Sequence, residues 1–262
     1  NKHTRHNGAP RMTTSVLHKQ PKLLMDPYPH IVIEDALPED IYNQLEKEWP
    51  TQQLLSTEPF DNGICYRLKS DQMLKPNVVS DSWRQFAEYH TSAKFYDEVK
   101  NIFGDFMPNI AEADKTISPR GWDKGGDKIG SDCQTVMHKP VDFSSRTPHI
   151  DNPREIYAGL LYMPYEDDTS TGGDFQLHRQ ASTITEVNKN GGRAVGDKAG
   201  DIVKTVPYKR NTFVMFCNNS TNTIHSVSAR KNAVRHRRSV NIIAEFNKVA
   251  RRSMFAVRET RK

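Results

Sequence analysis

The sequence predicts a mostly β fold, a jelly roll with flanking helices that form an N-terminal layer. The first observation is a series of short β-rich runs after about residue 130, each separated from the next by turn residues. Seven or more short strands at this spacing are typical of a sandwich, barrel or jelly roll. The second observation is a helical periodicity in roughly the first hundred residues, where apolar side chains recur every four positions.

Helices are expected in the N-terminal part of the chain. The first begins at Pro38, and Glu39 and Asp40 in its first turn complement the helix dipole. The apolar side chains of Ile41 and Leu45 then fall on one face, which is typical of a helix packed on a core. The expected elements of this part are a strand over 29–35 and helices over 38–50, 81–90 and 93–103.

The β-rich part of the chain supplies the predicted core. Its expected strands are 132–138, 156–163, 173–178, 201–206, 211–217, 222–227 and 238–246. The glycine-rich stretches 119–130 and 190–200 are expected to be long loops. The whole is interpreted as one domain over 21–250 with its β core at about 132–246, preceded by a flexible leader or cloning remnant (1–20) and followed by a basic tail (251–262).

Composition narrows the function classes. The chain has 262 residues, a mean hydropathy of −0.75, and no run near the roughly 20 apolar residues that a membrane helix needs. Its three cysteines form no CxxC pair, and no apolar stretch opens the chain, so a reducing, cytoplasmic location is expected. Without the basic first eleven residues the net charge falls from +5 to about +2, which indicates neither a nucleic-acid nor a membrane partner.

His149 and Asp151 form the first chemical motif, a His-x-Asp pair. Two residues spaced by two in a strand point to the same side and can hold one metal ion. With 10 histidines and 32 acids, roughly one such pair is expected by chance, so the pair alone is also compatible with a surface strand end.

A second histidine and an arginine extend this motif. His225 follows the apolar segment 212–216, and Arg237 opens an apolar strand twelve residues later. Two histidines and one carboxylate on one face of a metal leave three positions open, the arrangement of non-haem Fe(II) oxygenases. An arginine fork suits a planar carboxylate better than lysine, and Ser239 lies on the same strand face as Arg237.

Together these residues resemble the Fe(II)- and 2-oxoglutarate-dependent dioxygenases, which have a double-stranded β-helix fold, and in particular their prolyl-hydroxylase-like branch. The similarity covers roughly residues 132–246. It is carried by the His149–Pro153 run (HIDNP), Tyr162, Gly172–Phe175 (GGDF), the 213–216 strand, His225–Val227 and Arg237–Ser239.

The resemblance implies a set of roles. His149, Asp151 and His225 would bind Fe(II), and Arg237, helped by Ser239, would bind the far carboxylate of 2-oxoglutarate. Tyr162 stands where similar hydroxylases present a tyrosine to this cosubstrate, although it could equally be a core residue. With O2, such an enzyme hydroxylates a C–H bond of an amino acid, a peptide or a small metabolite and converts 2-oxoglutarate to succinate and CO2.

The arginine spacing departs from the pattern of this family. There the arginine often follows the distal histidine by nine or ten residues, which would point to Arg235. Arg237 is preferred because a serine follows it by two positions and because it leads directly into the apolar strand. Arg235 and Arg238 remain lesser candidates.

Three other functions are weighed against this one. A nucleic-acid demethylase of the same fold would carry Arg-x-Asn-x-x-x-Arg after the distal histidine, whereas the segment from Arg230 to Arg235 is one residue short. A halogenase would replace the carboxylate ligand by a small residue, which Asp151 argues against. A cupin-like protein that binds a metal or ligand without turnover would not need the Arg237–Ser239 anchor.

Overall fold

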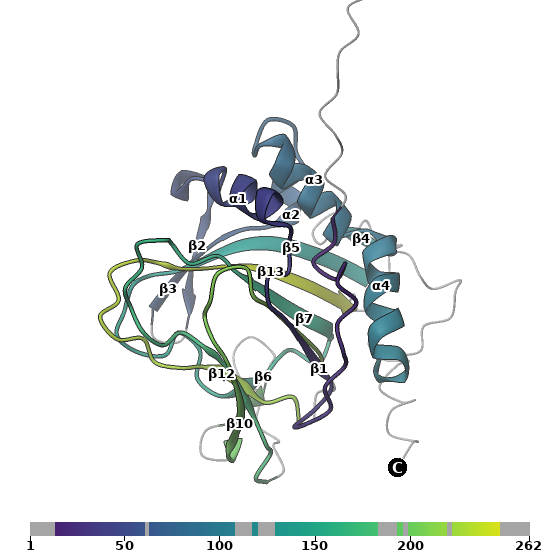
Figure 1. Ribbon diagram of the computed structural model, residues 1–262, viewed down its shortest axis with the longest axis vertical. Coiled ribbons are helices and arrows are strands. Elements are labelled where there is room, and N and C mark those ends of the chain that lie inside the picture. Colours follow the sequence, from purple (N-terminus) through teal and green to yellow (C-terminus); the bar gives the residue numbers. More distant parts are fainter. Residues whose placement is uncertain are drawn as a thin grey trace, which may run out of the picture.

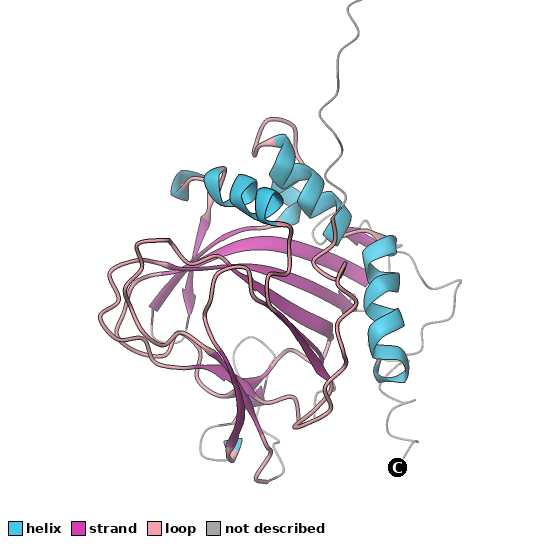
Figure 2. Ribbon diagram, viewed as in Figure 1, coloured by secondary structure: helices cyan, strands magenta, loops and turns pink. Residues whose placement is uncertain are grey.

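The computed structural model describes residues 14–60, 63–107, 117–119, 129–182, 193–195, 199–218 and 222–246. Two β-sheets enclose a cavity, and helices cover the outer face of the larger sheet (Figures 1 and 2). The cavity has a volume of about 540 Å³ and is lined from both sheets. Within the described residues, no helix combines the length and apolar character that a bilayer crossing needs.

The larger sheet has the strand order β1-β11-β7-β13-β5-β3-β2, with β4 pairing beside β5 in parallel and all other pairs antiparallel. Its strands are β1 (His30–Ile33), β2 (Ser56–Phe60), β3 (Gly63–Leu68), β4 (Ile117–Pro119), β5 (Ile129–His138), β7 (Glu155–Tyr162), β11 (Phe213–Cys217) and β13 (Arg237–Phe246).

The smaller sheet has the order β10-β8-β12-β6-β9 and is antiparallel throughout. Its strands are β6 (His149–Ile150), β8 (Phe175–His178), β9 (Arg193–Ala194), β10 (Ile202–Val206) and β12 (His225–Val227). The chain passes repeatedly between the two sheets, from β5 to β6, from β6 to β7 and from β7 to β8, as a jelly roll requires.

In the described part of the chain, four α-helices and two short 3-10 helices lie between β1 and β4, with the β2–β3 hairpin among them. The α-helices are α1 (Glu39–Lys47), α2 (Ser70–Met73), α3 (Asp81–His90) and α4 (Ala93–Phe103), and the 3-10 helices are η1 (Gln52–Leu54) and η2 (Gly104–Phe106). Ser80 and Ser92 cap α3 and α4, each accepting a hydrogen bond from a backbone N–H of the first turn. The apolar helix faces pack on the larger sheet around the fully buried Trp83.

In strand β13, alternate side chains face the helical layer and the cavity. Val240, Ile242 and Ala244 face the helices and belong to the main core. The alternate residues Asn241 and Ile243 point to the other face and line the cavity, as Arg237 does at the start of the strand. The helical layer therefore fixes which side chains of the central strand face the site.

These elements confirm the predicted fold class, a mostly β jelly roll with an N-terminal helical layer. The hairpin of β2 and β3 was not predicted, although Asp61-Asn62-Gly63 between the two strands is typical of a tight hairpin turn. Val16 and Leu17, which lie within the segment expected to be a leader (1–20), are buried in the core. The predicted tail (251–262), residues 1–13 and most of the two glycine-rich stretches lie outside the described residues.

Candidate metal centre

His149, Asp151 and His225 converge at one end of the cavity. His149 begins β6 and His225 begins β12, and the two are directly paired across the smaller sheet. Asp151 follows β6 and places its carboxylate between the two rings, with Oδ1 3.4 Å from His149 Nε2 and Oδ2 3.4 Å from His225 Nε2. Donor atoms that share one metal at roughly 2.1 Å lie about 3 Å apart, so the three side chains need only a small adjustment to hold an ion.

The tautomer of each histidine leaves the correct atom for a metal. Nδ1 of His149 lies 2.7 Å from the carbonyl oxygen of Thr147, and Nδ1 of His225 lies 3.0 Å from that of Thr223. A carbonyl oxygen can only accept, so each Nδ1 carries the proton and each Nε2 presents its lone pair toward Asp151. Within the described chain, these three residues are the one group of histidine, cysteine or acidic side chains with metal-binding geometry.

The electrostatic environment favours a neutral His149 and an ionised Asp151. Burial, with the nearby Arg146 and His225, lowers the pKa of His149 to about 4. Burial alone would raise the pKa of Asp151, but the adjacent His225 and His149 outweigh it and hold that pKa well below its ordinary value. At neutral pH His149 is therefore neutral and Asp151 is ionised, as metal ligation requires.

Packing holds the His225 ring in place. Phe175 stacks on it with the ring centroids 5.3 Å apart, and Phe216 lies against it at 4.6 Å. The His149 and His225 rings are themselves 4.2 Å apart. A ring fixed on several sides does not reorient when a ligand binds, which is the preorganisation that a metal centre needs.

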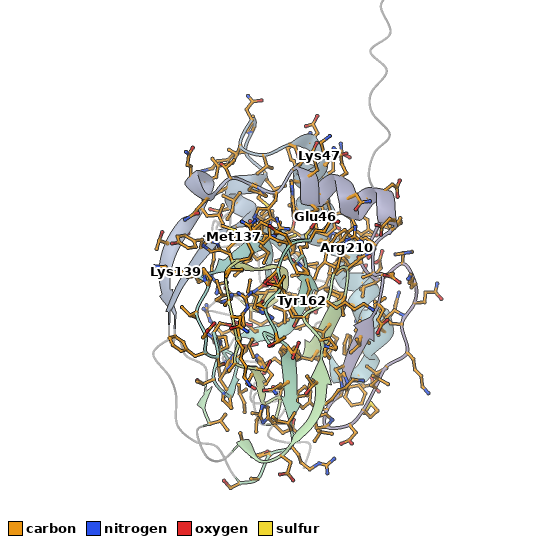
Figure 3. All side chains as sticks on the ribbon, turned by 60° about the vertical axis from the view of Figure 1, so that its left-hand side comes forward. Glu46, Lys47, Met137, Lys139, Tyr162 and Arg210 are labelled. Carbon is orange, nitrogen blue, oxygen red and sulfur yellow. The ribbon has the colours of Figure 1, made fainter. Side chains whose placement is uncertain are left out.

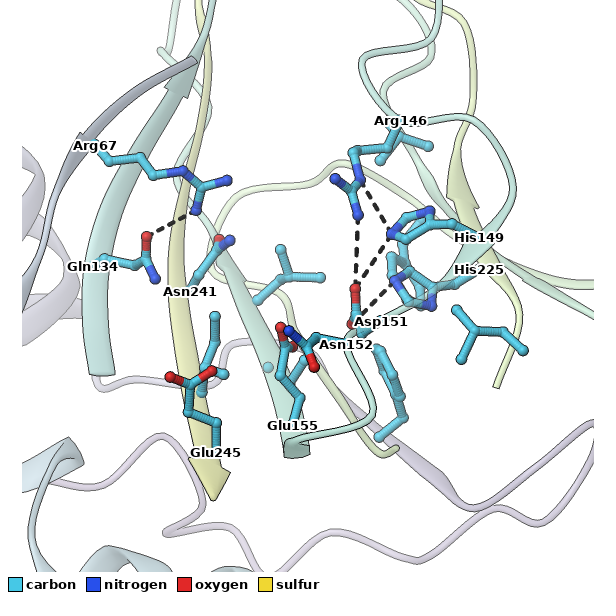
Figure 4. Close-up of a pocket in the computed structure, with 18 of the residues that line it drawn as sticks. Arg67, Gln134, Arg146, His149, Asp151, Asn152, Glu155, His225, Asn241 and Glu245 are labelled. Carbon is cyan, nitrogen blue, oxygen red and sulfur yellow. Dashed lines mark hydrogen bonds and ion pairs between the residues drawn. The ribbon is translucent and has the colours of Figure 1, made fainter. Parts of the chain in front are cut away.

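Arg146 stands directly over the candidate ligands (Figure 4). Its Nε donates to Nε2 of His149 at 3.1 Å, and its Nη2 lies 3.7 Å from Oδ1 of Asp151. A metal that takes the His149 lone pair must displace this hydrogen bond. No sequence signal marks Arg146, which lies three residues before the His-x-Asp pair in an irregular segment.

Arg237 is buried in the same cavity at the start of β13. Its Nε donates to the carbonyl oxygen of Gly173 at 2.8 Å, and its guanidinium lies 5.0 Å from the Tyr162 ring centroid and 4.9 Å from that of Tyr208. The Nη2 of Arg237 and the hydroxyl of Tyr162 are buried and have no hydrogen-bond partner among the described residues. A buried guanidinium is costly without an anion, so this corner fits a carboxylate.

Tyr162 lies in the interior beneath the helix that carries Glu46 and Lys47 (Figure 3). Burial raises the pKa of its phenol to about 12, so the hydroxyl stays protonated and can donate to an anion. It lies opposite Ser239 across the β13–β7 pair. The Ser239 hydroxyl donates to Oδ1 of Asn241 at 2.9 Å, so in this structure it is engaged along its own strand.

The two rival arginines have other partners. Arg235 is exposed and forms an ion pair with Asp167. Arg238 points to the helical side of β13, where it donates to the carbonyl oxygen of Met163 and pairs with Glu46. Of the three arginines, only Arg237 lines the cavity that holds the metal-binding triad.

The loop before β13 explains the long spacing from His225 to Arg237. It contains Arg230, which forms a buried ion pair with Asp168 at 2.9 Å and donates to the carbonyl oxygen of Arg235. The loop also bridges to Thr171 through Lys231. These contacts tie down the additional residues outside the cavity.

Several cavity residues carried no sequence signal. His138 was interpreted as an ordinary surface or hydrogen-bonded histidine, yet it is buried in the cavity, where it pairs across the sheet with Arg237. Burial, followed by the charges of Arg237, Arg67 and Arg146, holds the pKa of His138 well below its ordinary value. Its place depends on the register of distant strands, which no local pattern reveals.

Only the comparison with solved structures found proteins that are similar to this chain. No protein-family model matches the chain, and no curated protein matches it in sequence. Among solved structures it is similar to the epimerase SnoN in complex with Fe3+, alpha ketoglutarate and nogalamycin RO, with a TM-score of 0.50 and 11% identity, covering 82% of this chain and 78% of that one. This likeness shows a shared fold.

Two structures named as prolyl 4-hydroxylases are more distant. The one from Pseudomonas putida has a TM-score of 0.45 and 13% identity, with 84% of this chain and 92% of that chain covered. The one from Phytophthora capsici has a TM-score of 0.45 and 14% identity, with 84% of this chain covered. The match spans 60% of the length of the Phytophthora protein.

Proposed function

We propose that this protein is an Fe(II)- and 2-oxoglutarate-dependent oxygenase that hydroxylates a C–H bond of an amino acid, a peptide or a small metabolite. The observation that carries the proposal is that a candidate metal site and a buried arginine suited to a carboxylate line the same cavity. At one end, two histidine lone pairs and a carboxylate converge. The buried Arg237, with a guanidinium nitrogen still to be satisfied, opens onto the same cavity.

Each residue has a defined part in this proposal. His149, Asp151 and His225 would hold the iron and leave one face of it open. Arg237 and the Tyr162 hydroxyl would bind the far carboxylate of 2-oxoglutarate, and Gly173 would keep the guanidinium in place through its carbonyl oxygen. When bound, iron and 2-oxoglutarate supply the oxidation, in which substrate, O2 and 2-oxoglutarate give hydroxylated substrate, succinate and CO2.

The chain's own residues would control the surroundings of that reaction. The aromatic side chains of Phe175 and Phe216 cover the iron ligands on one side and limit access of water. Arg146 would leave His149 when the metal binds and would then face the substrate space. Asp151 as the third ligand occupies the position that a halogenase keeps open for a halide.

The test is conversion of 2-oxoglutarate to succinate by the full chain with Fe(II) and O2. Turnover above that of the iron-free protein is expected, and Asp151→Ala should abolish it. Asp167→Ala, which removes an exposed carboxylate that pairs with Arg235, should leave it unchanged. If the chain binds metal and 2-oxoglutarate tightly but forms no succinate, it is a binding protein of the cupin type.

The products separate hydroxylation from other outcomes on this fold. SnoN is named as an epimerase, so a shared fold does not fix the reaction. Once a substrate is found, the proposal requires one oxygen atom from O2 in the product for each succinate. A product that is isomeric with the substrate would contradict hydroxylation while leaving the metal and cosubstrate sites intact.

A further inference from the structure

The wall of the cavity across from the metal-binding triad presents hydrogen-bond donors. Arg67 of β3 extends into the cavity beside Gln134 of β5 and Asn241 of β13 (Figure 4). Gln134 and Asn241 lie directly opposite each other in the sheet. The unpredicted β2–β3 hairpin thus brings an arginine into the substrate space.

A buried chain of hydrogen bonds positions Arg67. Its Nη1 donates to Oε1 of Gln134 at 2.8 Å, and Nε2 of Gln134 donates to Oδ2 of Asp132 at 3.2 Å. The other oxygen of Asp132 accepts from the backbone N–H and the hydroxyl of Ser70 at 3.0 and 2.9 Å. Gln134 and Asp132 are 1% and 0% exposed. Such a buried relay gives the guanidinium a fixed direction, as a binding residue requires.

Asn241 adds to the same donor surface. Its Oδ1 accepts the hydrogen bond of Ser239 at 2.9 Å, which leaves the amide nitrogen as the group turned to the cavity. An arginine fork beside an amide N–H group matches the oxygens of a carboxylate or a phosphate.

The charge of the cavity favours the same ligand, on the assumption that the proposed function is correct. The iron, Asp151, the dianionic cosubstrate and Arg237 together carry no net charge. The other charged side chains among the described lining residues are four cations and two carboxylates: Arg67, Lys69, Arg146, Arg154, Glu155 and Glu245. Arg154 and Glu245 lie 3.8 Å apart and offset each other. The described residues that line the remaining substrate space therefore carry a net charge of about +2.

We propose that the substrate is a small molecule or residue that bears an oxyanion, a carboxylate or a phosphate, and that Arg67 binds this group with Asn241 beside it. This inference rests on the proposed function and deepens it, because it assigns the substrate class and a specificity residue. Arg67 holds the anionic end of the substrate on the larger sheet while the reacting carbon faces the triad across the cavity.

The test uses Mn(II) in place of iron, because Mn(II) broadens the NMR signals of any small molecule bound near it. The full chain is loaded with Mn(II) and saturated with 2-oxoglutarate, and acetate, inorganic phosphate and acetamide are titrated separately. Saturable broadening is expected for one or both anions and not for neutral acetamide. A larger effect for acetate assigns a carboxylate substrate, and a larger effect for phosphate assigns a phosphorylated one.

Variants locate the anion. Arg67→Gln should weaken anion binding about tenfold, as expected for the loss of a charge-assisted hydrogen bond, and Arg67→Lys should restore part of it. Asn241→Asp, which keeps the shape but adds a negative charge to the wall, should also weaken binding and serves if Arg67→Gln does not fold. Lys75→Gln, which removes an exposed charge from the segment after β3, should change nothing.

Two outcomes overturn the proposal. Equal broadening by acetamide, or anion binding that is unchanged in Arg67→Gln and Asn241→Asp, would show that no oxyanion site exists on this wall. Binding of 2-oxoglutarate is measured first, by calorimetry, so that the two proposals fail separately. A chain that binds no 2-oxoglutarate contradicts the proposed function, and the same titrations with Mn(II) alone then decide the anion site.

Discussion

Arg237 is the residue on which cosubstrate affinity should depend most, because it is a buried cation whose remaining donor opens onto the cavity. Losing a charge-assisted bond to a buried carboxylate costs roughly 2–5 kcal/mol, a fall of tens to thousands fold in affinity. Arg237→Ala should therefore weaken 2-oxoglutarate binding to the Mn(II)-loaded protein by at least tens of fold. Calorimetric titration measures this directly.

The neighbouring arginines are the matched controls for that variant. Arg235→Ala removes an exposed ion pair and should leave 2-oxoglutarate affinity unchanged. Arg238→Ala removes a contact to the helical layer, so it should lower thermal stability with little effect on affinity. A collapse of affinity confined to Arg235→Ala would move the anchor two residues upstream.

The positions of some cavity residues could be predicted from the sequence, and those of others could not. The proximity of His149 and Asp151 was predictable because the two residues are local neighbours, although Asp151 lies just after the end of β6. The position of Arg237 in the cavity was predictable from its place at the start of an apolar strand. Arg67 could not be found in this way, since its cavity position depends on the pairing of β3 with the distant β5. Arg146 lies in an irregular segment, where no sequence pattern indicates the direction of its side chain.

At the scale of elements, the backbone of the turn before β8 positions the Arg237 side chain. Gly172 has φ +76, and a Cβ there would lie 2.0 Å from the carbonyl oxygen of Ala229. Gly173 has φ +80, and its carbonyl oxygen accepts the Arg237 hydrogen bond. The turn therefore brings two backbone segments together and orients the guanidinium.

Gly172→Ala should disturb both functions of this turn. The positive φ and the close approach together should lower the free energy of unfolding by about 3 kcal/mol or more and weaken 2-oxoglutarate binding. Gly104→Ala is the matched control, since Gly104 also has positive φ (+51) but open space where a Cβ would stand. That control carries only the backbone cost of a positive φ, about 1–3 kcal/mol, and should leave binding unchanged. Equal losses in chemical denaturation would show that the contact with Ala229 is unimportant.

Most elements were predictable because their patterns are local. The helices α3 and α4 were placed at 81–90 and 93–103 with the bounds that the structure shows. The β2–β3 hairpin was missed although its turn sequence, Asp61-Asn62-Gly63, is a local signal, because the flanking strands show no clear apolar alternation. It nevertheless contains Arg67, which lines the cavity.

At the scale of the whole molecule, a buried histidine joins the first described residues to the helical layer. His90 ends α3 and is fully buried, its Nδ1 donating to the carbonyl oxygen of Phe86 at 2.8 Å and its Nε2 accepting from the N–H of Val16 at 3.2 Å. Burial lowers the pKa of His90 to about 4. The imidazole must be neutral to accept the Val16 hydrogen bond.

This histidine should make stability depend on pH. Because the pKa is lower in the folded state than in the unfolded state, protons bind preferentially to the unfolded chain below about pH 6.5. The free energy of unfolding should therefore fall as the pH falls, and His90 should account for about 3 kcal/mol of the loss between pH 7 and pH 4. His90→Gln should flatten this part of the pH profile in denaturation experiments. The same change at exposed His18 should not, and a parallel profile for His90→Gln would contradict the assignment.

The fold joins the two halves of the site through its two sheets. The triad lies on the smaller sheet and the adjoining segment, while Arg237, Tyr162 and Arg67 lie on the larger one. In the proposed function 2-oxoglutarate would contact both sheets at once, so metal and cosubstrate should bind interdependently. Residues of both sheets are needed to line the cavity.

The measurement that tests this account most directly is calorimetric titration of the full chain with 2-oxoglutarate, with and without Mn(II), in the wild type and in Asp151→Ala. The account predicts one 2-oxoglutarate per chain when Mn(II) is present, and binding that is at least tenfold weaker without the metal or in the variant. Binding that is equally strong with and without Mn(II), or no binding of 2-oxoglutarate under either condition, would contradict it.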